Sequence, residues 1–141
     1  MYVNNETGAV QPIKEVIDIK NSKKPGIKVH VDAVQAYGKL DIDLSKLRID
    51  MMSVSAHKIH GPKGVGCLFV RDGVKINPIM LGGGQEDGLR SGTENVPLIA
   101  GFSRAALIAH QNINKNYNKV WDIKRTFLDE LAKTSLEYEV I

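Results

Sequence analysis

Apolar and polar positions follow two different periods along the chain, and this difference separates expected strands from expected helices. Residues 27–31 alternate, residues 51–55 are mostly apolar, and Tyr2-Val3 resembles the end of a further strand. Residues 66–70 are apolar throughout, which predicts a strand buried on both faces. A short fifth strand is expected over residues 76–81.

Helical spacing governs two other stretches. The first begins at Pro12, whose missing N–H costs nothing in a first turn, and ends before the breaker pair Pro25-Gly26. The second runs from about Pro97 to Lys133, and the Asn-rich segment 112–118 is expected to break or bend it. A short helix is also expected at residues 44–47. Strands that alternate with helices predict an α/β fold with a mainly parallel sheet.

Both ends of the chain carry strand-like patterns. Met1-Tyr2-Val3 resembles a strand already under way, and residues 136–141 alternate like a strand that has just begun. We therefore expect this chain to be a piece of a longer protein, whose sheet contains further strands. Its 141 residues suffice for one domain with a real core.

Composition narrows the class of protein. Apolar content is 43% and charged content 25%, as in ordinary soluble domains. The net charge is only +3 and the basic residues are scattered, which argues against nucleic-acid binding. No apolar run is long enough to span a membrane, and we expect no signal peptide. One cysteine, Cys67, cannot form an internal disulfide, and this fits a cytoplasmic location. The histidines show no metal-ligand spacing, so no metal site is expected.

Two residues at the ends of expected strands suggest chemistry. Lys58 follows strand 51–55, and Asp32 ends strand 27–31, so both lie at the mouth of the sheet, where α/β proteins bind ligands. A lysine there can form a Schiff base, and an aspartate can pair with the ring nitrogen of pyridoxal phosphate. Taken singly, Lys58 reads as a surface lysine and Asp32 as a helix N-cap.

Four segments together resemble one enzyme family. They read VNNETG at 3–8, HVDAVQ at 30–35, SVSAHKIHGPKG at 53–64 and GGGQEDGLRSGT at 82–93. In this order and spacing they resemble the NifS/IscS-like cysteine desulfurases of the class-V aminotransferase group. The resemblance implies the three-layer α/β/α large domain of the aspartate aminotransferase fold, with residues 1–134 in that domain and residues 135–141 beginning a small domain.

The resemblance also assigns roles to individual residues. Lys58 would bind pyridoxal phosphate covalently and move protons, and Asp32 would pair with the pyridinium nitrogen. Gln35 would hydrogen-bond the phenolic oxygen. Ser55 and His57 would bind the cofactor phosphate. Asn5 would lie near the phenolic oxygen and the substrate carboxylate. Thr93 would bind the phosphate of the partner subunit's cofactor in a homodimer.

Each of these side chains also has an ordinary structural explanation. His57 would then be a structural histidine, Ser55 a capping residue and Gln35 a solvated side chain. Asn5 would be a turn residue, and Thr93 the N-cap of the long helix. The joint order of the four segments favours the functional interpretation.

The family's activity would be removal of sulfur from L-cysteine, which leaves L-alanine and an enzyme persulfide. The sulfur acceptor would be an iron–sulfur scaffold protein or a tRNA-thiolating enzyme. In the family, the stacking histidine, the carboxylate-binding arginine and the nucleophilic cysteine come from segments outside this chain. Cys67 lies in an expected buried strand and does not replace that cysteine, so we expect the chain alone to be inactive.

Three other interpretations remain open. The first is a selenocysteine lyase or another pyridoxal-phosphate enzyme of class V. The second is a non-catalytic protein that keeps the fold for assembly. The third is a nucleotide-binding module, although no G-x-G-x-x-G or P-loop pattern follows a strand. The Gly-rich segment 82–93 favours the desulfurase group over the first of these.

Overall fold

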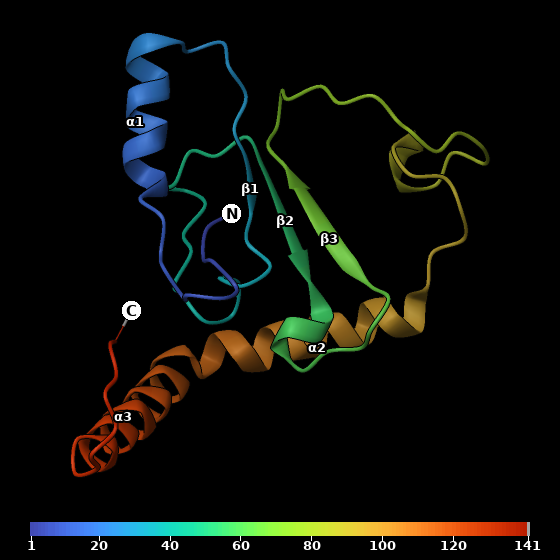
Figure 1. The fold of residues 1–141 in the computed structure, drawn as a ribbon. Coiled ribbons are helices and arrows are strands. Elements are labelled where there is room, and N and C mark those ends of the chain that lie inside the picture. Colours follow the sequence, from blue (N-terminus) through green and yellow to red (C-terminus); the bar gives the residue numbers. More distant parts are fainter. Residues whose placement is uncertain (141) are drawn as a thin grey trace.

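The computed structural model describes residues 1–140, and Figure 1 shows how its helices and strands are arranged. In chain order the elements are α1 (Ile13–Lys23), β1 (His30–Asp32), β2 (Met51–Ser55), the 3-10 turn η1 (Ala56–Ile59), β3 (Gly66–Val70), the 3-10 turn η2 (Glu86–Gly88), α2 (Val96–Gln111) and α3 (Ile113–Leu131). The strands expected at 51–55 and 66–70 are confirmed at both ends, and so is the helix after Pro12.

The described sheet has three strands in the order β1-β2-β3. β1 and β2 are parallel, with Asp32 opposite Ser53, whereas β2 and β3 are antiparallel, with Ser55 opposite Gly66. Side chains alternate across a strand. Val31 of β1 therefore faces the core, and the next residue, Asp32, lies on the opposite face. In β2 the buried positions are Met52 and Val54.

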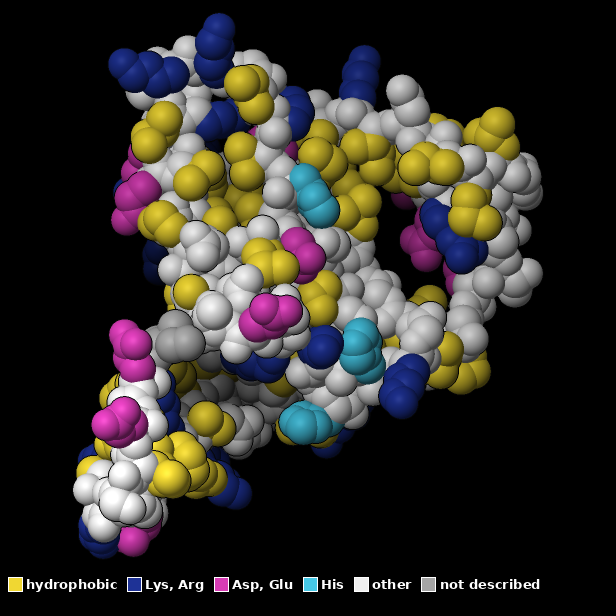
Figure 2. Space-filling view, viewed as in Figure 1, with side chains coloured by type: hydrophobic (Ala, Val, Ile, Leu, Met, Phe, Trp, Pro, Cys, Tyr) yellow, Lys and Arg dark blue, Asp and Glu magenta, His cyan; other side chains and the backbone are white. Residues whose placement is uncertain are grey.

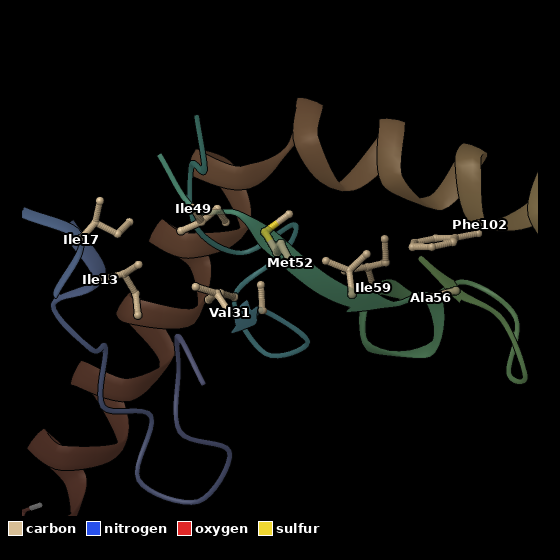
Figure 3. Close-up of a cluster of buried hydrophobic side chains, with 11 residues drawn as sticks. Ile13, Ile17, Val31, Ile49, Met52, Ala56, Ile59 and Phe102 are labelled. Carbon is tan, nitrogen blue, oxygen red and sulfur yellow. The ribbon is translucent and has the colours of Figure 1, made fainter. Parts of the chain in front are cut away.

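One hydrophobic core joins both sides of the fold, and Figure 3 shows it as a continuous row of side chains. The row starts at Ile13 and Ile17 of α1, passes Val31 and Met52, and reaches Phe102 of α2. Its other members are Ala33, Ala36, Ile49, Val54, Ala56 and Ile59. The strands therefore share one core with α1 and α2, and η1 packs on α2.

β1 is shorter than the strand expected at 27–31. The Val29 N–H donates to the carboxylate Oδ2 of Asp50 at 2.8 Å, so it is not available to a neighbouring strand. Asp50 is only 6% exposed, and its carboxylate also contacts the ammonium groups of Lys20 at 3.5 Å and Lys28 at 3.4 Å. Although burial alone would raise the pKa of Asp50, the Val29 hydrogen bond and the two lysines outweigh it and leave that pKa below its ordinary value.

β3 does not have the burial that its sequence predicts. Gly66, Cys67 and Leu68 are exposed, and only the last two residues of β3 are half-buried. The physical reason is position, since within residues 1–140 β3 lies at the edge of the sheet with β2 on one side. Cys67 is thus an exposed cysteine rather than part of a buried core.

Three further expectations about secondary structure are wrong. Residues 76–81 form no strand, because Pro78 supplies no N–H and Ile79 is 96% exposed. Residues 44–47 form a single turn, closed by the Leu47 N–H bond to the Asp43 carbonyl at 2.8 Å, and no helix continues from it. Residues 136–140 are irregular, and residue 141 lies outside the described residues.

The long C-terminal helix is interrupted within the expected Asn-rich segment. Asn112 has φ −115° and ψ 11°, and its side-chain amide donates to the carbonyl of Ile108 at 2.8 Å. The non-helical backbone of Asn112 ends α2, and α3 begins at the next residue. The start of α2 is capped by Asn95, whose side chain accepts from the Leu98 N–H at 3.2 Å, so the cap is not Thr93.

α2 packs closely on η1, and glycines make this approach possible. A Cβ on Gly61 would lie 2.9 Å from the Cβ of Ala56 and 3.2 Å from that of Ala105 in α2. A Cβ on Gly38, which has φ +72°, would lie 2.8 Å from Cγ2 of Ile59. Larger side chains at either position would push η1 away from the helix.

Gly61→Ala should destabilise the chain because its new methyl group has no room beside Ala56 and Ala105. Overpacking of this kind costs about 1–3 kcal/mol of unfolding free energy, measured by chemical denaturation. Gly26→Ala is the matched control, since a Cβ at Gly26 meets nothing within 4 Å. Equal stability of Gly61→Ala and Gly26→Ala would show that this close packing does not contribute.

Asp50→Asn should destabilise the chain at neutral pH by about 1–3 kcal/mol, because it removes the buried negative charge that interacts with Val29, Lys20 and Lys28. A lowered pKa means that the contribution of Asp50 is present above its unfolded-state pKa and is lost as the pH falls through the folded-state value. The stability difference between wild type and variant should therefore shrink below about pH 4.

The control for this prediction is Asp18→Asn. Asp18 forms an exposed pair with Lys14 at 2.6 Å on α1, and exposed pairs contribute little to stability. Urea unfolding at a series of pH values measures both variants. A pH-independent cost for Asp50→Asn, or an equal cost for Asp18→Asn, would contradict the assignment.

Candidate functional site

The carboxyl ends of β1 and β2 meet at one edge of the sheet because the two strands are parallel. Asp32 is the last residue of β1, and its partner in the register is Ser53 of β2. Ser55 ends β2 two residues later, so it shares the face of Ser53 and Asp32. The expectation that Asp32 and the segment before Lys58 lie at a common edge is therefore supported by the pairing.

Asp32 is held in place through both its side chain and its backbone. Its Oδ1 accepts a hydrogen bond from the Val34 N–H at 2.9 Å, and its carbonyl accepts from the Tyr2 N–H at 2.7 Å. Ala33, the next residue, is fully buried and donates to the carbonyl of Ser53 at 2.9 Å. The half-buried Asp32 side chain is thus fixed over the sheet edge, where it can receive a cationic group.

Ser55 and His57 form a hydrogen-bonded pair. Ser55 Oγ lies 2.7 Å from His57 Nδ1, with one hydrogen between them. If the hydroxyl donates to Nδ1, the Nε2–H of His57 stays available, and if Nδ1–H donates to Oγ, the Ser55 O–H stays available. Either arrangement leaves a donor for an anion, and neither side chain acts as a cap for η1.

Lys58 lies in η1, which begins at the end of β2. Ala56 and Ile59 of η1 are buried, whereas His57 and Lys58 are exposed. His60 ends the turn in the left-handed region with φ 65°. Packing of the buried residues against α2 therefore turns the two exposed side chains away from the core and toward solvent.

Gln35 belongs to a second short link at the same edge. Its Oε1 accepts a hydrogen bond from Nζ of Lys39 at 2.9 Å, so Gln35 is not simply a solvated side chain. Partial burial lowers the pKa of Lys39, and the charge of Lys58 lowers it further. The geometry agrees, because Gly38, the neighbour of Lys39, packs against Ile59, the neighbour of Lys58. Lys39 was not identified from sequence, although its spacing of four residues from Gln35 was a usable signal.

Asn5 is brought toward this edge by the N-terminal segment. The Tyr2 N–H bonds to Asp32, and a turn follows in which Asn4 Oδ1 accepts from the N–H groups of Glu6 and Thr7, each at 2.9 Å. The capping residue of this turn is thus Asn4, and the neighbouring Asn5 has an exposed side chain.

Thr93 is exposed in the loop that leads into α2. The loop is closed by Gln85, whose Oε1 accepts from the Gly92 N–H at 2.9 Å. No described hydrogen bond connects Thr93 to Asp32 or Lys58, so within residues 1–140 the structure does not join Thr93 to the other candidate residues.

The surroundings of Cys67 disfavour its thiolate form. Partial burial raises the pKa of its thiol, and the negative charge of Glu86 raises that pKa further. The reactive form of cysteine is the thiolate, which a raised pKa disfavours. The expectation that Cys67 is inert because it is buried is therefore wrong about its burial, since the residue is exposed, and the inertness itself stays a prediction.

The chemistry of the side chains at this edge fits pyridoxal phosphate. Asp32 is an acid suited to a basic ring nitrogen, Lys58 is an amine suited to an aldehyde, and the Ser55–His57 pair offers a donor to a phosphate. Gln35 adds an amide with donor hydrogens. These groups match the separate functional groups of one such cofactor.

Comparison with known proteins identifies the class. The aminotransferase class-V family matches residues 1–138, so the chain belongs to this family, whose members generally depend on pyridoxal phosphate. Proteins similar to the chain include cysteine desulfurases named IscS and NifS-like proteins, which confirms the resemblance drawn from the four segments.

Three relatives illustrate the match. The chain is 43% identical to cysteine desulfurase IscS 1 of Archaeoglobus fulgidus over 97% of its own length and 35% of that protein. It is 48% identical to the mitochondrial cysteine desulfurase of Saccharomyces cerevisiae, over 99% of this chain and 27% of that protein. A solved NifS-like protein aligns with a TM-score of 0.91 and 46% identity, over 94% of this chain and 36% of that chain.

The structural match confirms the predicted α/β fold class. The chain spans about a third of the length of the relatives it matches. Within residues 1–140, no helix combines the length and the apolar character needed to cross a bilayer.

Proposed function

We propose that this chain forms the cofactor-binding part of a pyridoxal-phosphate-dependent cysteine desulfurase. The observation that carries the proposal is the placement of Asp32 and the Ser55–His57–Lys58 segment at the carboxyl ends of two adjacent parallel strands. Relatives named cysteine desulfurase match more than nine-tenths of the chain and support the proposal.

Each side chain would bind a different group of the cofactor. Lys58 would hold its aldehyde carbon, Asp32 its protonated ring nitrogen, and Ser55 with His57 its phosphate. Gln35 would donate to the phenolic oxygen, and Asn5 would lie near that oxygen and the substrate carboxylate. When bound, the cofactor supplies an electron sink for bond cleavage at the α-carbon of an amino acid.

Proton movement is the task of this chain's own residues. The amine of Lys58 would take the proton from the substrate α-carbon and return it, acting as base and then as acid. The carboxylate of Asp32 would keep the ring nitrogen protonated, and its hydrogen bond from Val34 fixes the carboxylate orientation. The Ser55–His57 pair would orient the phosphate end, so that the reacting atoms stay beside Lys58.

The substrate we propose for the whole protein is L-cysteine, which would yield L-alanine and a persulfide. The sulfur would pass to an iron–sulfur scaffold protein or a tRNA-thiolating enzyme in the cytoplasm. The corresponding domain assignment gives residues 1–134 to the large domain and residues 135–141 to the start of the small one.

We also propose a homodimer, in which Thr93 reaches the cofactor of the partner subunit. The support is the loop over 76–93, where Ile79 is 96% and Leu81 81% exposed. In Figure 2 this loop projects at the right-hand side of the molecule and carries hydrophobic side chains on its surface. Apolar surface of this kind is typical of an interface between subunits.

Covalent cofactor binding tests the proposed site. After incubation with pyridoxal phosphate and borohydride reduction, peptide mass spectrometry should find the label on Lys58, because its amine would react with the aldehyde. Lys63→Ala, which changes an exposed lysine in the following loop, should leave the labelling of Lys58 intact. Labelling spread evenly over the exposed lysines would contradict the assignment.

Incubation of this chain with L-cysteine and a reductant should release no alanine above the background without protein. The physical reason is that Cys67 is its one cysteine and has a raised pKa. Alanine release measured by chromatography checks this expectation. Turnover that disappears in Cys67→Ser would show instead that Cys67 is the sulfur acceptor.

A further inference from the structure

The hydrogen bond between Lys39 and Gln35 fixes which end of an amide faces which way. A lysine ammonium has donors and no acceptor, so the Gln35 atom 2.9 Å from Nζ of Lys39 has to be the oxygen Oε1. The other end of the same amide is Nε2, which carries two donor hydrogens. The amide is therefore orientated by chemistry, with its donors directed away from Lys39.

The backbone of Lys39 is fixed by hydrogen bonds and packing, and its exposed side chain extends from this fixed point. The Lys39 and Leu40 N–H groups donate to the carbonyl of Ala36 at 3.0 and 2.9 Å. Ala36 is fully buried, and Gly38 approaches Ile59 of η1 so closely that a Cβ would lie 2.8 Å from it. Lys39 thus extends from a tight turn that is packed against the same η1 segment that carries Lys58.

The segments of Lys39 and Lys58 are in contact through Gly38 and Ile59, and the charge of Lys58 contributes to lowering the pKa of Lys39. Because two ammonium groups repel each other, a nearby acceptor stabilises the charged form of Lys39. A hydrogen bond to the uncharged oxygen of Gln35 gives Lys39 a partner without placing a carboxylate beside Lys58.

We propose that Lys39 is a positioning residue, which turns the side-chain amide of Gln35 so that its Nε2 donors face an acceptor oxygen of the bound cofactor. This inference rests on the proposed function, since the acceptor is the phenolic oxygen of pyridoxal phosphate. Lys39 acts through Gln35 and does not itself contact the reacting atoms. Its substitution should change cofactor affinity while leaving the fold intact.

The first test uses the chain without cofactor. The side-chain amide signals of Gln35 are assigned in a proton–nitrogen NMR spectrum by their loss in Gln35→Ala. Lys39→Met should shift or broaden them, because the amide loses the donor that fixes it. Lys39→Arg should keep them near their original positions. Unchanged Gln35 signals in Lys39→Met would overturn the proposal.

The second test measures affinity for pyridoxal phosphate by absorbance titration. Lys39→Met should bind about threefold to tenfold more weakly, the loss expected for one orientated hydrogen bond, and Lys39→Arg should restore most of the affinity. Lys46→Met is the matched control for charge, because Lys46 is 86% exposed and pairs with Asp43. An equal loss in Lys39→Met and Lys46→Met, or in Lys39→Met and Lys39→Arg, would overturn the positioning role.

Thermal unfolding of the same variants separates positioning from a structural role. Lys39→Met should unfold within a few degrees of wild type, whereas a comparable loss of stability and affinity would overturn the proposal. If the unchanged chain is not labelled at Lys58, the proposed function fails, and the NMR test still decides whether Lys39 orientates Gln35.

Discussion

Parallel pairing of β1 with β2 is the constraint on which the candidate site depends. It places Asp32 opposite Ser53, and so brings two segments that are separated by nearly twenty residues to one edge of the sheet. The pairing persists because the opposite face is apolar, with Val31 and Met52 packed between α1 and α2. A slip by one residue would turn Asp32 into the core and Val31 onto the site face, and burial of an unpaired carboxylate forbids that register.

The turns after the strands convert this pairing into an arrangement of functional groups. η1 is anchored by Ala56 and Ile59, and the following Gly61 permits close contact with α2. The segment after β1 is anchored in the same way by Ala33 and Ala36. Small and apolar residues therefore hold the backbone, while the polar residues between them stay free to bind a ligand.

Sequence patterns predict the parts of this fold that depend on local periodicity. The strand Met51–Ser55 and the helix Ile13–Lys23 lie where the patterns place them. The shortened β1 was not predictable in this way, because its start is decided by a hydrogen bond to Asp50, about twenty residues away in sequence. The prediction that β3 is buried on both faces was wrong, because an apolar run does not reveal whether a strand has one neighbour or two.

The candidate site likewise has features that the sequence predicts and features that it does not. The motifs predict Asp32, Ser55, His57 and Lys58 as a group, and the strand pairing supports their common edge. The Ser55–His57 contact and the Lys39–Gln35 contact depend on side-chain geometry, which residue order alone does not specify.

The edge position of β3 has a practical consequence for work with this chain. A strand paired on one side presents a row of free N–H and C=O groups, which is a template for addition of a strand from another molecule. Leu68 is 48% exposed on this strand, and neither a proline nor a charged residue interrupts Gly66–Val70. Concentrated solutions of the chain should therefore favour intermolecular β-sheet growth, and a short peptide complementary to this strand should act as a cap that keeps the molecules apart.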